Sequence, residues 1–217
     1  MKSKLPSIVL GLLMIAGASL TAPTFAKPSA APPPPDYFPI KDGYWWKYKT
    51  TNLDTKASSE WKLSVLGTEK GDDGASLSKL EVDTGSMKTD EWYSKPKGWV
   101  MKHRIEYPAN NMKGTYTPPD KYLMNPLTPG ATWDWSGKGM MDVEASHKDT
   151  VKGAETVTVP AGKFTCMRVD TETVQGGQPV HKTYWYANFI GLVKSQTESG
   201  NVKNQSELVD YSFKKKG

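Results

Sequence analysis

The stretch Val157-Thr-Val-Pro-Ala-Gly-Lys-Phe-Thr-Cys-Met-Arg-Val169 predicts two strands joined by a tight turn. Val157 and Val159 alternate with threonines, as side chains do on the two faces of a strand. Pro160 cannot donate a ladder hydrogen bond and Gly162 allows a sharp turn, so the chain reverses here. The stretch carries no catalytic group and therefore indicates architecture rather than activity.

Alternation of apolar and polar residues continues through most of the chain beyond residue 36. Trp61, Leu63 and Val65, for example, share one strand face, which we expect to point inward. Apart from the N-terminal segment, no window keeps a helical period. The prediction is an all-β fold: a single antiparallel, strongly curved sheet, half-barrel or lipocalin-like, in one domain spanning residues 37–217.

An internal similarity suggests two related halves of this sheet. Residues 39–48 and 126–135 share the pattern Pro-x-x-x-Gly-x-x-Trp-x-aromatic without a gap. We therefore expect halves at 37–121 and 122–217, with Trp46 and Trp133 in equivalent places. The proline-rich region Pro108–Pro129 breaks the alternation, so it is expected to be irregular, either a connection between the halves or a lid.

A family resemblance rests on four short motifs. They are Pro160-Ala-Gly-x-Phe-x-Cys166, Trp185-Tyr-Ala187, Gly191-Leu-Val-Lys194 and Glu207-Leu-Val-Asp-Tyr211. In this order they resemble a family of bacterial exported domains of unknown function, with distant similarity to LolA-type lipoprotein carriers. The motifs hold turn and core positions, so the resemblance implies a fold and an exported location. Anchored members need a cysteine at the end of the signal peptide, and here the single cysteine is Cys166.

The N-terminus predicts export. Residues 1–26 have a basic start, an apolar run and a Thr-Phe-Ala cleavage site, which is typical of a signal peptide cleaved after Ala26. Residues 27–36 are a proline-rich linker that favours an extended chain. The mature chain is expected in the periplasm or secreted, with no transmembrane segment, and its one cysteine leaves no intrachain disulfide.

The sequence contains no motif typical of catalysis or of binding nucleic acid, a metal or a cofactor. The net charge of +5 is spread along the chain, which is a poor footprint for nucleic acid. No metal-binding spacing, nucleophile elbow or phosphate-binding glycine loop is present, so we expect no cofactor and no metal. Cys166 lies within an expected strand, where a small buried apolar residue is the better interpretation. The chain is predicted not to be an enzyme.

The aromatic content favours a binding role. A sheet without helices must bury its apolar face by closing, by packing its halves together, or by holding a lipid, an acyl chain or a partner segment. The residues expected to line such a groove are Trp99, Met101, His103, His181, Trp185 and Tyr211. The alternatives are an envelope structural or protein-interaction domain, with an envelope protein as partner, and a carbohydrate-binding module using exposed aromatics.

Overall fold

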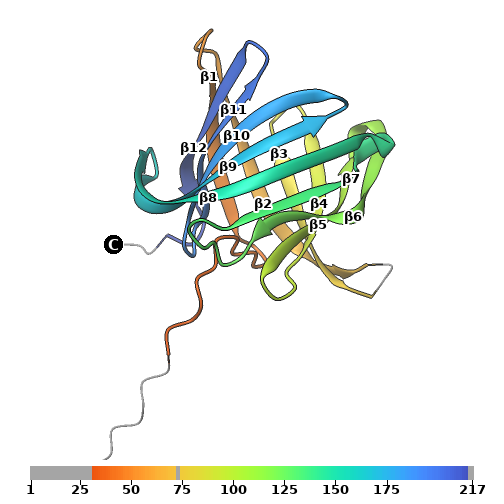
Figure 1. The fold of residues 1–217 in the computed structure, drawn as a ribbon, viewed down its shortest axis with the longest axis horizontal. Helices are drawn as coiled ribbons and strands as arrows, with labels where there is room; N and C mark the ends of the chain where they lie inside the picture. Colours follow the sequence, from red (N-terminus) through yellow and green to blue (C-terminus); the bar gives the residue numbers. More distant parts are fainter. Residues whose placement is uncertain (1–30, 72–73, 215–217) are drawn as a thin grey trace, which may run out of the picture. The chain divides into compact units, whose positions relative to one another are not determined.

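The computed structural model describes residues 31–71 and 74–214, and within them twelve strands form one antiparallel sheet (Figure 1). All of the strands belong to a compact unit that begins at Pro34. The strands are β1 (Trp45–Asn52), β2 (Ser58–Lys70), β3 (Ser76–Asp83), β4 (Lys88–Ser94), β5 (Trp99–Tyr107), β6 (Met112–Met124), β7 (Thr132–Lys138), β8 (Glu144–Val159), β9 (Gly162–Gln175), β10 (Gln178–Ala187), β11 (Gly191–Ser199) and β12 (Val202–Tyr211). Two single 3₁₀ turns are η1 (Pro108–Asn110) and η2 (Met140–Asp142).

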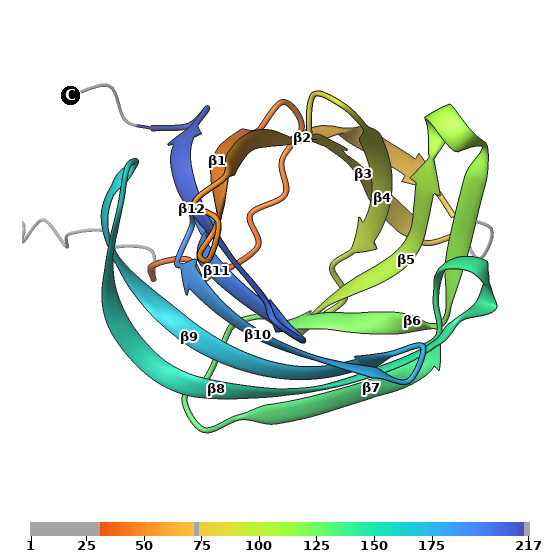
Figure 2. The ribbon, with the colours of Figure 1, turned by 90° about the horizontal axis from the view of Figure 1, so that it is seen from above.

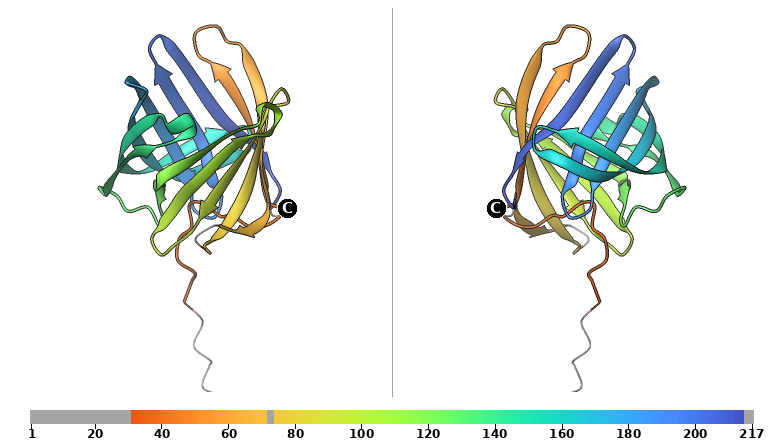
Figure 3. Two further views of the ribbon diagram at one scale, coloured as in Figure 1. Left: turned by 90° about the vertical axis from the view of Figure 1, so that its right-hand side faces the viewer. Right: turned by 90° about the vertical axis from the view of Figure 1, so that its left-hand side faces the viewer.

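The sheet closes into a barrel. Each strand pairs with its neighbours in sequence, and β1 also pairs with β12, from Trp46 opposite Tyr211 to Asn52 opposite Asn204. Figure 2 shows the strands encircling a common interior, and Figure 3 shows their tilt from two sides. The all-β antiparallel prediction is confirmed, whereas the open half-barrel is corrected: closure pairs both edges and removes the exposed backbone groups of an open sheet.

The described residues begin within the expected linker. The expected signal peptide, residues 1–26, and the first part of the linker lie outside the described residues. Residues 31–35 are exposed and have no regular structure. Asp36, the last residue of the expected linker, is instead bonded to turns of the barrel.

The expectation of an irregular Pro108–Pro129 is wrong, because β6 runs through it. Pro118 and Pro119 cannot donate ladder hydrogen bonds, yet they lie in a strand that hardly needs them. On the β5 side they fall within a register shift, and on the β7 side the ladder consists of the single pair Thr117 and Lys138. Prolines are tolerated here because few ladder hydrogen bonds to the neighbouring strands need a backbone N–H donor at these positions.

Two tryptophan side chains of β7 donate hydrogen bonds to the backbone of β6, where ladder pairs are absent. The indole Nε1 of Trp133 donates to the carbonyl oxygen of Lys121 at 2.9 Å. The indole Nε1 of Trp135 donates to the carbonyl oxygen of Pro118 at 3.1 Å. Side chains of β7 therefore fasten β6 at the place where backbone pairing is sparse.

The two similar sequence segments occupy equivalent places in the barrel. The backbone amide of Gly43 donates to the carbonyl oxygen of Val65 at 3.1 Å, and the backbone amide of Gly130 donates to the carbonyl oxygen of Val151 at 2.9 Å. Both glycines have positive φ angles, 80° and 81°, which other residues adopt at a cost. Val65 and Val151 are both buried, and a β-bulge follows each of them.

The match extends to the fourth strand of each half. Trp92 on β4 and Trp185 on β10 each lie under two basic side chains, and a register shift follows each. These basic side chains are Lys79 and Arg104 over Trp92, and Arg168 and Lys194 over Trp185. Strands β7–β12 thus repeat these particular features of β1–β6. The expected boundary after residue 121 falls inside β6, so the halves meet in the β6–β7 turn.

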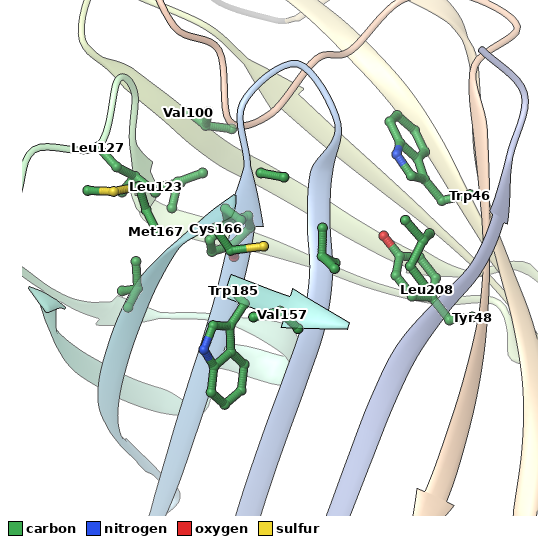
Figure 4. Close-up of a cluster of buried hydrophobic side chains, with 14 of the residues drawn as sticks. Trp46, Tyr48, Val100, Leu123, Leu127, Val157, Cys166, Met167, Trp185 and Leu208 are labelled. Carbon is green, nitrogen blue, oxygen red and sulfur yellow. The ribbon is translucent and has the colours of Figure 1, made fainter. Parts of the chain in front are cut away.

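The core confirms the interpretation of Cys166 as a small buried residue. Trp46 and Tyr48 project from the same side of β1, and Cys166 is fully buried beside Met167 (Figure 4). Burial raises the pKa of the Cys166 thiol to about 12, with a smaller contribution from Glu155. At neutral pH the thiol is protonated and behaves as a small apolar side chain.

Candidate functional site

Two adjoining cavities lie inside the barrel. The first has a volume of about 420 Å³ and the second about 280 Å³. Side chains from β1–β4, β6, β10 and β11 line the first cavity, and side chains from β5–β10 line the second. Because strands on opposite sides of a closed barrel contribute to each cavity, both lie in the interior.

The first cavity has a largely apolar wall. Alternation on β1 and β2 brings Trp46, Tyr48, Trp61 and Leu63 to it, and Leu80 of β3 continues the surface. Tyr48 stacks on Trp61 with ring centroids 4.2 Å apart, and its hydroxyl is held by a backbone carbonyl. The wall is therefore aromatic and aliphatic, and Trp61 and Leu63 point inward as expected, while Val65 is buried but does not line the cavity.

The segment that precedes β1 covers one end of this cavity. Phe38 reaches the cavity and contacts Tyr93 and Tyr122, with ring centroids 5.2 and 5.6 Å away. Pro39 and Ile40 line the cavity beside it. We call residues 36–40 the strap.

Asp36 fixes the strap to three turns at this end of the barrel. Its carboxylate accepts hydrogen bonds from Lys95 at 2.7 Å and from the Asn125 amide at 2.8 Å, while its carbonyl oxygen accepts the Phe189 amide at 2.7 Å. Burial alone would raise the pKa of Asp36, but the bonds from Lys95 and Asn125 outweigh it and hold that pKa below its usual value.

A buried ion pair lies at the wall of the first cavity, which Glu91 lines. Lys102 donates to Glu91 at 2.8 Å, and the Tyr93 hydroxyl donates to the same carboxylate at 2.6 Å. Burial opposes both charges. The Lys102 charge and the two hydrogen bonds nevertheless hold the pKa of Glu91 below its usual value, and Glu91 raises the pKa of Lys102. Both groups are therefore charged and compensate each other.

The second cavity contains a histidine held between two carboxylates. His147 Nδ1 lies 2.5 Å from Asp149 and Nε2 lies 2.7 Å from Asp120, while Thr171 donates to Asp149. The ring stacks on Trp135 at 5.6 Å. Burial opposes the charged imidazole, but the two carboxylates outweigh it and raise the pKa of His147 to about 9. This group is an imidazolium at neutral pH, which does not suit it to act as a general base.

Lys182 lines both cavities and is half-buried. In the described part of the chain, its ammonium makes no hydrogen bond or ion pair. Burial, together with repulsion from Lys102, lowers its pKa, while Asp120 and Asp149 oppose this through space. Lys182 thus faces the cavities without a carboxylate partner, unlike Lys102 and His147, which are each held by carboxylates.

The six residues expected to form a groove line neither cavity. They are Trp99, Met101, His103, His181, Trp185 and Tyr211. On β5, Lys102 reaches the interior, so its neighbours Met101 and His103 belong to the other face; His103 lies 2.8 Å from the Ser94 hydroxyl. Trp99 packs edge-on against Trp133.

The other three also lie apart. His181 is exposed, and Trp185 donates to Glu155 at 2.8 Å on the face of β10 opposite Lys182. Tyr211 packs against Phe213 beyond the end of β12, with ring centroids 4.9 Å apart. The structure does not bring these residues together at either cavity.

The interior residues on β10 were missed because both of its faces are aromatic. Tyr184 and Tyr186 face the cavities with Lys182, while Trp185 lies on the outside under Arg168 and Lys194. Alternation along a strand assigns its residues to two faces but does not show which face points into the barrel. The sequence signal for the second cavity was present, because Val143, Ala145, His147 and Asp149 share one parity.

Two features of the described chain bear on other functions. Across residues 31–71 and 74–214 there is no group of three His, Cys, Asp or Glu side chains arranged to hold a metal ion. In the same residues no helix has the length and apolar character needed to cross a membrane.

Comparison with known proteins identifies the family. Residues 75–209 match the model of the DUF3108-like family, and the chain therefore belongs to that family. This confirms the resemblance to a family of domains of unknown function, whereas similarity to LolA-type carriers stays a prediction. None of the curated proteins compared with the chain matches it.

A solved structure shares the fold. A candidate exported protein with a YmcC-like fold from Bacteroides fragilis is 16% identical, with a TM-score of 0.51, and the match covers 82% of this chain and 99% of that one. The hypothetical lipoprotein YmcC from Escherichia coli is 13% identical, with a TM-score of 0.40 over 76% of this chain and 84% of that one. At 16% identity the likeness to the Bacteroides fragilis protein concerns architecture alone.

Proposed function

We propose that this DUF3108-like protein is an exported, non-enzymatic binding protein that holds an apolar or amphipathic small molecule inside its barrel. The observation that carries the proposal is the aromatic cavity of about 420 Å³. Pockets for small molecules generally have volumes of about 300–1,000 Å³ and mostly apolar walls with a few polar groups. Trp46, Tyr48, Trp61 and Leu63 supply such a wall.

The size of the cavity favours binding over a purely structural role. Protein interiors are close-packed and hold few voids larger than a water molecule. An eight-stranded barrel is filled by its own side chains or holds one small ligand, and twelve strands enclose more space. The cavity is also preformed, because backbone carbonyls fix the hydroxyl of Tyr48 and the indole of Trp46. A preformed site loses less conformational entropy when it binds.

Export is supported by the N-terminal sequence of residues 1–26, which has the parts of a secretory signal. The description of the Bacteroides protein as a candidate exported protein agrees with this. A non-enzymatic role is supported by the charged state of His147 and the protonated state of Cys166 at neutral pH.

A cavity-filling substitution tests the proposal. The neutral fluorescent probe N-phenyl-1-naphthylamine should bind the mature protein, and Leu63→Trp should weaken its binding at least tenfold by occupying the cavity. Leu66→Trp is the matched control, because Leu66 is 52% exposed on the same strand. Native mass spectrometry of protein purified from envelope extracts should show a bound small molecule. Absence of both probe binding and a co-purified molecule would refute the proposal.

A further inference from the structure

We propose that the ligand is a single-chain amphiphile with an anionic head group, and that Lys182 binds this head group inside the barrel. The inference rests on the proposed function and names the class of molecule that the cavity takes. It depends on three observations: the isolated charge of Lys182, the compensation of the other interior charges, and the direction in which the cavity changes from apolar to polar.

Lys182 is the interior cation that lacks a direct partner. The ammonium groups of lysine residues are strongly hydrated, and burying one without a partner is unfavourable. Lys102 has Glu91 at 2.8 Å, and His147 lies between two carboxylates. In the described residues no carboxylate comes within ion-pair distance of Lys182. A carboxylate or phosphate in the first cavity would give this ammonium a charge-assisted hydrogen bond.

The carboxylates nearest to Lys182 leave room for such an anion. Asp120 and Asp149 line only the second cavity, where both are bound to His147. Lys182 lines both cavities, so it stands between these carboxylates and a head group in the first cavity. Glu91 does line the first cavity, but its oxygens are taken by Lys102 and Tyr93.

The strand register gives the first cavity an apolar end and a polar end. Near the strap, Tyr186 of β10 pairs with Leu192 of β11. Four residues earlier on β10, Lys182 pairs with Thr197, whose side chain also lines the cavity. Thr84, in the turn between β3 and β4, lies at this second end as well. The end away from the strap is therefore polar, and Lys182 is its cation.

The geometry thus orients the ligand. An alkyl chain would lie along Trp46 and Leu63 towards the strap, and the head group would meet Lys182 and the Thr197 hydroxyl. A ligand with an uncharged head would gain the apolar contacts but leave the ammonium without a partner. A cationic head would be repelled by Lys182. The site therefore selects by charge as well as by apolar area.

The test compares ligands that share one alkyl chain and differ in the head group. Isothermal titration calorimetry on the mature protein would use dodecanoate, dodecyl phosphate, 1-dodecanol and dodecyltrimethylammonium. At least one anion should bind about 10- to 100-fold more tightly than dodecanol, which is the range expected of one charge-assisted hydrogen bond. The two anions distinguish a carboxylate from a phosphate as the preferred head.

Three variants assign the effect to Lys182. Lys182→Met should abolish the preference for the anion and keep dodecanol binding, which also shows that the variant is folded. Lys182→Arg should retain the preference. Lys49→Met, a substitution of an exposed lysine on β1, should behave as the wild type.

The outcomes separate the two proposals. Equal binding of anion and alcohol by the wild type, an unchanged preference in Lys182→Met, or tighter binding of the cation would each overturn the role of Lys182 while the binding function stood. Failure of all four compounds to bind would overturn the proposed function itself.

Discussion

Gly137 on β7 provides the sharpest test of how the two halves of the barrel meet. A Cβ atom at this position would lie 2.5 Å from the carbonyl oxygen of Thr117 and 2.8 Å from the indole ring of Trp135. The first of these contacts is with backbone, which cannot rotate away. Gly137→Ala should therefore force β7 away from β6 at the single ladder pair that joins them.

The sign of this effect is informative because two contributions oppose each other. Gly137 does not have a positive φ, so alanine suits its backbone, and replacing a strand glycine would by itself stabilise by roughly 0.5–1 kcal/mol. Overpacking of a well-packed site costs about 1–3 kcal/mol. With a 2.5 Å contact to backbone the steric cost should prevail, and we expect a net destabilisation of about 1–2 kcal/mol.

Gly139→Ala is the matched control two residues away. Its Cβ would lie 3.3 Å from the ring of Tyr116, a side chain that can shift slightly, and the free energy of unfolding should stay within about 1 kcal/mol of the wild type. Urea denaturation followed by tryptophan fluorescence measures both variants. For a chain of this size, each kcal/mol lowers the Tm by roughly 2–4 °C. A Gly137→Ala protein as stable as the wild type would refute the close approach of β6 and β7.

Three further predictions concern stability. Trp133→Phe removes the indole hydrogen bond to the Lys121 carbonyl and should lower the free energy of unfolding, measured in urea, by about 0.5–1.5 kcal/mol. An unchanged free energy of unfolding would contradict the role of Trp133 in joining β6 to β7. The pKa of His147 is raised to about 9, so its contribution to stability is complete below pH 6.5 and is lost as the pH rises through 9. Urea titrations from pH 6 to 10 should show this loss in the wild type and not in His147→Gln. Asp36→Ala should lower the Tm at neutral pH. Because the pKa of Asp36 in the folded state is below its usual value of 3.8, the difference in Tm between variant and wild type should shrink as the pH falls below 3.8. A difference in Tm that stays constant would argue against the Lys95 ion pair.

Alternation in the sequence was sufficient to locate most strands. The turn at Pro160–Gly162 joins β8 to β9 as expected, and Trp61, Leu63 and Val65 lie in β2. These elements are predictable because a half-buried strand imposes a period of two on its own residues. The equivalence of Gly43 and Gly130 was likewise readable, since a turn that requires positive φ selects glycine.

Two features depended on neighbours that a single strand does not encode. Prolines ordinarily indicate a loop, but those in β6 are tolerated because β7 supplies indole donors in place of a ladder. On β10, alternation separated Lys182, Tyr184 and Tyr186 from Trp185 without showing which set faces inward. The outer Trp185 is covered by Arg168 and Lys194 from the adjacent strands, and only the completed sheet shows that cover.

The closing ladder between β1 and β12 has a consequence for folding. Every other strand pair is a local hairpin, but this pair joins residues about 150 positions apart, such as Asn52 and Asn204. By the usual logarithmic dependence, the entropic cost of closing so long a loop is only roughly 4 kcal/mol, but it must be met before the ladder can form. Loss of the last strand would leave β1 and β11 as two unpaired edges, each able to recruit a strand from another molecule. A polypeptide lacking β12 should therefore self-associate. In the complete barrel, β12 prevents such aggregation because it pairs with both edges.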